Sequence, residues 1–117
     1  MNLLLIESYK FGEMIIAGQV YTRDLIILSS VIKDNWWRIK GHELAVADIR
    51  DVIDKEQPEI LIVGTGKSGM MKVLSETKTY LDTSGIALIA EKTDKACDIF
   101  NQYRLSKKVV GAFHLTC

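Results

Sequence analysis

The sequence predicts an α/β domain in which helices pack on a mixed β-sheet. Segments 60–63 and 86–90 are apolar at every position, and strands of this kind need both faces covered. Segments with helical spacing alternate with these strands, which is typical of helices packed on a sheet. The first third is strand-like throughout and predicts an additional hairpin layer beside that sheet.

Length and charge limit the classes of function. The 117 residues fit one domain, 1–117, and 48% hydrophobic with 26% charged residues suit a soluble core-forming chain. Fifteen basic residues balance fifteen acidic ones, so neither nucleic acid nor an anionic membrane is an expected partner. The apolar start, Met1–Ile6, is interrupted by Glu7 and is too short for a signal peptide or a membrane span. Two cysteines without metal-ligand spacing favour a reducing compartment, so we expect a cytoplasmic protein.

The first third contains short runs rich in Ile, Leu and Val. A tight hairpin is expected at Ala17-Gly18-Gln19, because Gly adopts positive φ without steric cost. The predicted strands are Leu3–Glu7, Glu13–Ala17, Val20–Thr22 and Leu25–Leu28.

Helical spacing begins after this region. An amphipathic helix with its apolar residues at Val46, Ile49, Val52 and Ile53 ends before Pro58. The strand Ile60–Val63 follows.

The last third alternates helices and strands. Ser75 is the candidate N-cap of a helix over Glu76–Thr83, and Gly85 suits its C-terminal cap. Thr93 is the candidate cap of a third helix after the strand Ile86–Ala90. The buried residues of that helix are predicted to be Ala96, Ile99, Phe100 and Tyr103, and Val109–Leu115 is the last strand.

A glycine-rich loop after the strand Ile60–Val63 resembles two phosphate-binding signatures. Its six residues, which form the candidate ligand-binding set, are Gly64, Thr65, Gly66, Lys67, Ser68 and Gly69. A P-loop needs a glycine where Leu61 stands. A dinucleotide site needs the helix to begin within the glycines, whereas Met70–Val73 intervenes. No nucleotide cofactor is therefore expected. Two interpretations stay open: a site for a carboxylate or phosphate, or a turn whose glycines only satisfy unusual backbone angles.

The pair Trp36-Trp37 is followed by Arg38. Neighbouring residues of an extended segment face opposite ways, so one Trp is expected in the core and the other near the surface. An exposed Trp beside Arg38 is a good anchor for a partner. The alternative is that both tryptophans cover an apolar edge under a loop. The candidate partner surface is Trp36, Trp37, Arg38 and His42.

The remaining polar residues suggest no reaction. We expect His42 to cap backbone groups at a helix entry, His114 to be hydrogen-bonded in the core or at an edge, and Asp24 to lie in a surface turn. Cys97 is expected to pack, and the sequence does not show whether Cys117 is reactive. No spacing indicates acid–base carboxylates or a metal site, so no catalytic or metal residue is assigned.

Several segments, taken in order, resemble one known family across nearly the whole chain. They are Tyr9-Lys10-Phe11-Gly12, Tyr21-Thr22-Arg23-Asp24, Trp36-Trp37-Arg38, Gly41-His42-Glu43-Leu44, Pro58-Glu59, Gly64-Thr65-Gly66 with Gly69 and Met71, and His114-Leu115-Thr116-Cys117. Together they resemble the adipogenesis-associated Mth-like domain family, which includes the mitochondrial assembly factor for NADH dehydrogenase (respiratory complex one).

This resemblance implies a three-layer Mth-like fold. It implies a central five-stranded mixed sheet with one antiparallel strand, helices packed on it and a small extra β layer. It also implies that the glycine loop belongs to a family-wide pocket. Ala45 stands where a Ser or Thr would cap the first helix, so that entry is expected to rely on His42 or Glu43. The chain shows no mitochondrial presequence, so the organelle role is not carried over.

The leading functional hypothesis is a non-catalytic binding or assembly/regulatory protein with a protein partner. The alternative is a protein, enzymatic or not, that binds a small molecule or anion through loop 64–69.

Overall fold

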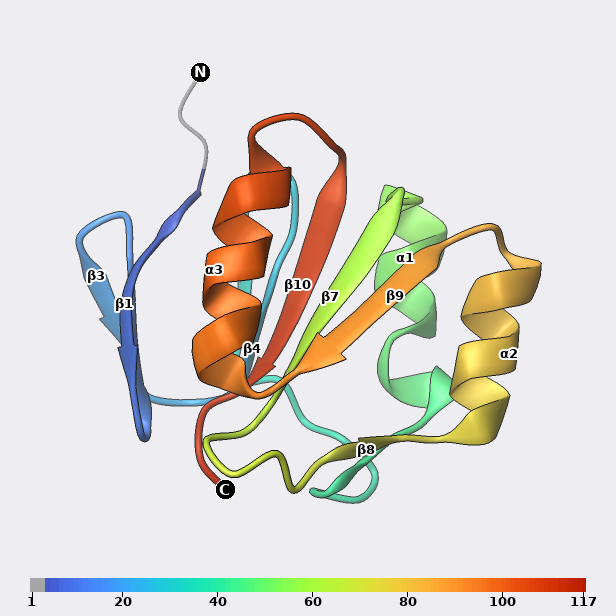
Figure 1. Ribbon diagram of the computed structural model, residues 1–117, viewed down its shortest axis with the longest axis horizontal. Helices are drawn as coiled ribbons and strands as arrows, with labels where there is room; N and C mark the ends of the chain where they lie inside the picture. The colour runs from blue at the N-terminus through green and yellow to red at the C-terminus, as the bar shows by residue number, and fades with distance from the viewer. Residues whose placement is uncertain (1–3) are drawn as a thin grey trace.

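The computed structural model describes residues 4–117 and contains a central five-stranded mixed sheet (Figure 1). Its strand order is β5-β4-β10-β7-β9. The strands are β4 (Leu25–Ile27), β5 (Ile32–Asp34), β7 (Ile60–Thr65), β9 (Ala87–Glu91) and β10 (Val109–His114). Strands β7, β9 and β10 are parallel, and β4 is antiparallel to both of its neighbours. The predicted mixed sheet with one antiparallel strand is confirmed for the described residues.

A three-stranded antiparallel sheet forms the extra β layer. It consists of β1 (Ile6–Lys10), β2 (Glu13–Ile16) and β3 (Gln19–Tyr21). The expected hairpin turns at Ala17 and Gly18, whose φ angles are 49° and 79°. The predicted strand Leu3–Glu7 is displaced: Leu3 lies outside the described residues, and β1 continues to Lys10 because that residue pairs with Glu13 across the turn.

The helices lie on both faces of the central sheet. They are the short 3₁₀ helix η1 (Val46–Asp48), α1 (Arg50–Glu56), α2 (Ser75–Thr83) and α3 (Thr93–Arg104). Figure 1 shows α3 and the β1–β3 layer on one side, with α1 and α2 on the other. The predicted three-layer α/β fold is therefore confirmed.

The predicted helix caps are partly wrong. Ser75 and Thr93 are the first helical residues, and neither of the preceding residues makes a side-chain cap. The Thr93 hydroxyl bonds the Gly66 amide and the His114 carbonyl, both outside its own helix. The first helix relies neither on His42 nor on Glu43, because the Ala45 amide donates to Asp48 Oδ2 at 2.8 Å. Gly85 follows α2 with a φ of 75°, as its predicted role requires.

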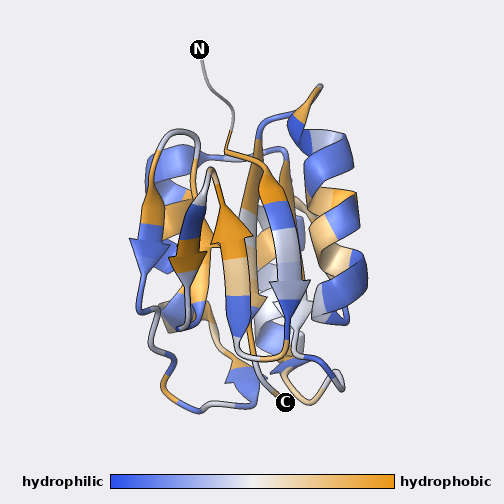
Figure 2. Cartoon of the chain, turned by 90° about the vertical axis from the view of Figure 1, so that its left-hand side faces the viewer, coloured by the Kyte–Doolittle hydropathy of each residue, from blue (hydrophilic) through white to orange (hydrophobic). Residues whose placement is uncertain are grey.

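Two apolar cores lie on opposite faces of the sheet. Both central strands, β7 and β10, are buried at every residue. One core joins the sheet to α1 and α2 through Leu61, Val63 and Val110. The other joins it to α3 and β1–β2 through Ile62, Phe100 and Phe113. Figure 2 shows the apolar residues concentrated in the strands. The strand β9 is an edge strand that exposes Ala87 and Ala90. The prediction that segment 86–90 is covered on both faces is therefore wrong.

A two-stranded parallel sheet joins the segments that follow β5 and β7. It pairs β6 (Glu43–Leu44) with β8 (Lys72–Val73). The Lys72 amide also donates to the His42 carbonyl at 2.9 Å. The tryptophan segment and the end of the glycine loop are therefore held side by side.

Candidate functional site

The carboxyl ends of β7 and β10 meet the first residue of α3 at one edge of the sheet. Thr93 joins all three elements: its hydroxyl accepts from the Gly66 amide at 2.8 Å and donates to the His114 carbonyl at 2.7 Å. In Figure 1 the C-terminus lies at this edge, beside the loop that follows β7. Candidate site residues from distant parts of the chain therefore lie close together at this edge.

The glycine loop binds the chain's own C-terminal segment. The Lys67 amide donates to the Thr116 carbonyl at 2.7 Å, and the Met70 amide donates to the Cys117 carbonyl at 3.1 Å. The Gly69 amide donates to the Gly66 carbonyl at 3.2 Å. With the Gly66 amide bonded to Thr93, these amides are occupied inside the protein. An anion at the loop would have to displace these contacts.

The other candidate ligand-binding residues lie on both sides of this contact. Gly64 and Thr65 are buried at the end of β7, and the Thr65 hydroxyl donates to the Glu91 carbonyl at 3.0 Å. Lys67 and Ser68 are exposed, and the Lys67 ammonium pairs with Asp94 at 2.8 Å. The strand β8 lies between the glycines and α2, so the helix does not begin within the glycines as a dinucleotide fingerprint requires.

A buried charged cluster lies beside the C-terminal segment. Asp24 Oδ2 lies 2.8 Å from His114 Nδ1 and 2.9 Å from Arg38 Nη2, and Asp24 Oδ1 accepts from the Leu115 amide at 2.7 Å. Burial by itself raises the pKa of Asp24, but the hydrogen bonds from His114 and Leu115 and the Arg38 charge outweigh it and lower that pKa. The prediction of a surface turn for Asp24 is wrong, because Asp24 joins three segments.

The cluster leaves two buried nitrogens unsatisfied. Among the described residues, neither His114 Nε2 nor Arg38 Nη1 has a hydrogen-bond partner. The His114 ring is buried, as predicted, and 6% of the residue is exposed. Since a carboxylate only accepts hydrogen bonds, Nδ1 of His114 donates to Asp24, and Nε2 is the ring nitrogen left without a partner. Buried polar atoms of this kind need an explanation.

The tryptophan segment lies next to the cluster. Trp36 is 4% exposed and Trp37 is 79% exposed, so the two side chains face opposite ways, as the sequence predicted. The Trp36 Nε1 donates to the Asp48 carbonyl at 3.1 Å. The Arg38 side chain is only 4% exposed and lies over the Trp36 ring at 4.7 Å. Of the four candidate partner residues, Trp37 and His42 are therefore the exposed ones.

A pocket of about 450 Å³ opens beside this segment. It is lined by Arg23, Asp24, Asn35, Trp36, Trp37, Arg38, Ile39 and Gly41. Trp37 and Ile39, both largely exposed, give it an apolar margin above the charged cluster.

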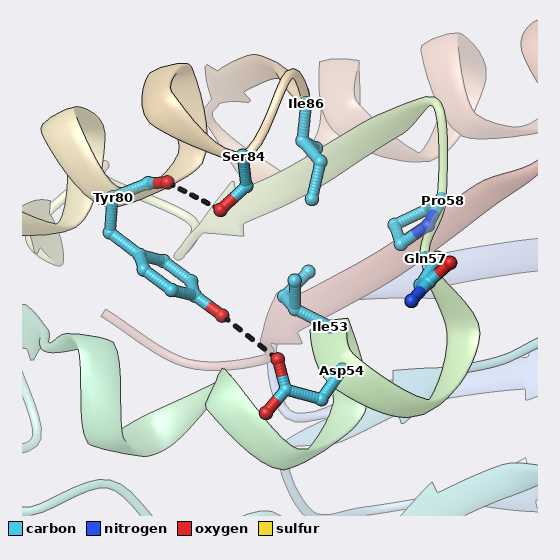
Figure 3. A pocket seen from close by; sticks show the side chains of 7 residues that line it. All are labelled: Ile53, Asp54, Gln57, Pro58, Tyr80, Ser84 and Ile86. Carbon is cyan, nitrogen blue, oxygen red and sulfur yellow. Dashed lines mark hydrogen bonds between the residues drawn. The ribbon is translucent and has the colours of Figure 1, made fainter.

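A second pocket, of about 360 Å³, lies between α1 and α2 (Figure 3). Hydrogen bonds between its lining residues run from the Tyr80 hydroxyl to Asp54 at 3.5 Å and from the Ser84 hydroxyl to the Tyr80 carbonyl at 2.7 Å (Figure 3). It begins near Pro58, at the opposite end of β7 from the glycine loop, and it contains none of the clustered residues. We assign it no chemistry.

Comparison with known proteins identifies the family. The profile of the DUF498/DUF598 family, proteins of unknown function, matches residues 6–114. The chain belongs to this family. A conserved hypothetical protein from Pyrococcus horikoshii shares the DUF498 fold with a TM-score of 0.82 and 25% identity, covering 96% of this chain and 98% of that one.

Two further structures are similar to this DUF498 chain. A Bartonella henselae protein described as an outer membrane protein matches with a TM-score of 0.81 and 21% identity over 99% of this chain and 98% of its own. A Mth938-like domain from Bordetella pertussis matches with a TM-score of 0.67 and 16% identity over 96% and 85%. These likenesses show the fold alone. Within the described part of the DUF498 chain, no helix is both long and apolar enough to cross a membrane.

Sequence spacing missed the grouping of His42, His114 and Cys117. One donor atom from each of these side chains lies within 4.8 Å of the other two. His114 and Cys117 are three residues apart at the end of β10, but His42 precedes β6 and only the fold brings it to them, so no local motif contains the whole group. The available signal was weaker: polar residues that follow apolar strands gather at one sheet edge.

Proposed function

We propose that this DUF498 chain is a non-catalytic binding or assembly protein that holds a protein partner against the surface formed by Trp37 and Ile39. The observation that carries the proposal is the 79% exposure of Trp37. Large aromatic side chains at the margin of a pocket are common anchors of protein–protein interfaces. The partner is expected to present an apolar segment that fills the neighbouring pocket.

The segment that carries Trp37 is held in place by the residues on either side of it. Trp36 fixes it to the core, and the Arg38 guanidinium donates twice to the Gly41 carbonyl, at 3.1 and 2.7 Å. Little conformational entropy is then lost when a partner binds, which favours affinity.

The resemblance to the adipogenesis-associated Mth-like domain family supports the same proposal, because that family includes an assembly factor for respiratory complex one. We also propose that 1–117 forms one such domain and that it works in the cytoplasm. The free thiols of Cys97 and Cys117, both within the described residues, support a reducing compartment. The anion-binding alternative at Gly64–Gly69 has less support, because the amides of Gly66, Lys67 and Gly69 are bonded within the chain.

The test is a quantitative pull-down from the source cells with the full chain as bait. We expect Trp37→Ala to lose the partners that the wild type retains, at least tenfold. The matched control is Leu105→Ala, which truncates another exposed apolar residue (67% exposed) outside the pocket. Equal recovery with wild type and Trp37→Ala overturns the proposal, as does equal loss with both variants.

A further inference from the structure

We infer that His42, His114 and Cys117 form a binding site for a thiophilic divalent cation of the zinc class. This inference is separate from the proposed protein-binding surface and does not depend on it. Its first support is geometric: one ring nitrogen of each histidine and the Cys117 Sγ lie within 4.8 Å of one another. Two imidazoles and a thiolate match the nitrogen and sulfur ligands that zinc takes in proteins.

The second support is the unsatisfied nitrogen of His114. Its Nδ1 is bonded to Asp24 Oδ2 at 2.8 Å, so Nε2 is the nitrogen left to bind a cation. That atom is buried and has no hydrogen-bond partner in the part of the chain that the structure describes. A carboxylate that accepts from one ring nitrogen while the other binds metal is the usual arrangement around histidine ligands, because it fixes the tautomer and orients the ring.

The third support is how the other two ligands are held. The His42 carbonyl accepts from the Lys72 amide, and the Cys117 carbonyl accepts from the Met70 amide. The backbone of both residues is therefore bonded to the segment that follows the glycine loop, while both side chains remain exposed. The rings of His42 and His114 lie 5.9 Å apart between centroids. Zinc bonds are roughly 2.0–2.3 Å long, so two ligands on one ion lie closer than 4.8 Å. Rotation of the two exposed side chains supplies the needed approach.

The charges around the site are compatible with a cation. The nearby Arg38 guanidinium is compensated by Asp24, which it contacts at 2.9 Å. Binding a divalent cation releases the Cys117 proton, so the bound ligand is a thiolate. Three protein ligands leave a fourth position open in a tetrahedral site, which a water molecule can fill.

The test uses Co²⁺ as a spectroscopic probe with the full, reduced chain. We expect one equivalent of Co²⁺ to produce a thiolate-to-cobalt charge-transfer band and the visible bands of tetrahedral cobalt, and Zn²⁺ to abolish both. Cys117→Ser is expected to remove the charge-transfer band. His42→Ala is expected to weaken Co²⁺ binding at least tenfold. Both side chains are exposed, so these variants are expected to fold.

Cys97→Ser is the matched control, because Cys97 is the other cysteine and is buried on α3. It is expected to keep the complete cobalt spectrum. The inference is overturned if the wild type shows no charge-transfer band, if Cys117→Ser retains it, or if His42→Ala binds Co²⁺ as tightly as the wild type. Loss of the protein-partner contacts in Trp37→Ala with an unchanged cobalt spectrum would show that the two sites are independent.

Discussion

Gly66 is the position where the glycine loop and the C-terminus are most tightly interlocked. Its φ is +105°, and a Cβ built there would lie 2.4 Å from the Cys117 carbonyl carbon and 2.7 Å from the Thr116 oxygen. These neighbours are backbone atoms, so no side-chain rotation relieves the clash. Gly66→Ala must therefore push the C-terminal segment away from the loop.

The cost of this substitution has two parts. An L-residue in this backbone region is strained by about 1–3 kcal/mol. Displacement of the C-terminus also breaks the hydrogen bonds from Lys67 and Met70 to Thr116 and Cys117, each contributing about 0.5–1.5 kcal/mol. We expect the free energy of unfolding to fall by about 2–6 kcal/mol, measured by urea denaturation.

Substitutions at two other glycines distinguish the cost of backbone strain from the cost of the clash. Gly85 has a φ of +75° with nothing within 4 Å of a built Cβ, whereas Gly41 has open space and no positive φ. Gly85→Ala is expected to cost about 1–2 kcal/mol from backbone strain alone. Gly41→Ala is expected to stay within about 0.5 kcal/mol of the wild type. The reasoning is refuted if Gly66→Ala costs no more than Gly85→Ala, because the C-terminal contact would then contribute nothing.

Three further predictions concern buried groups. Asp24→Asn is expected to lower the free energy of unfolding by about 3–5 kcal/mol, because the buried Arg38 loses its counter-charge; a urea-measured loss below about 1 kcal/mol would contradict this. Burial raises the pKa of the Cys97 thiol to about 12, so at pH 8 a thiol reagent should label Cys117 and leave Cys97 unreacted until the protein unfolds. Two equally fast labelling phases would contradict that. The pKa of the Cys97 thiol is raised from 9.0 on folding. The thiol's contribution to the free energy of unfolding is therefore fully present below about pH 9 and is lost as the pH rises toward 12. Cys97→Ala should therefore lessen the loss of stability at alkaline pH in urea titrations.

The sequence predicted the fold well where local patterns and packing agree. The apolar run Ile60–Val63 became a central strand, and the helical spacing of Ala96 and Phe100 placed α3 correctly. Helix starts were less predictable, because a hydroxyl near a helix end has several possible partners. Thr93 illustrates this, since its hydroxyl bonds the Gly66 amide and the His114 carbonyl in place of its own helix.

The candidate site was predictable only in fragments. The opposite orientation of Trp36 and Trp37 follows from adjacent positions on one extended segment, which is a local property. The partners of Asp24 are not local: His114 lies in β10, and Arg38 lies in the loop after β5. Asp24, Arg38 and His114 come together because β10 lies between β4 and β7. The spacing of residues in the sequence does not predict that strand order.

This topology also explains why the glycine loop resembles a phosphate site although the amides of Gly66, Lys67 and Gly69 are bonded within the chain. The glycines allow the backbone of the C-terminal segment to approach, as they would allow a pyrophosphate. At Gly66 the space that a side chain would fill is taken by the carbonyl groups of Thr116 and Cys117. Those contacts position Cys117 near His42 and His114. The loop therefore acts on the inferred cation site indirectly, and a variant such as Gly66→Ala should weaken Co²⁺ binding even though Gly66 supplies no ligand. Unchanged Co²⁺ affinity in folded Gly66→Ala would show that the loop does not position the thiol.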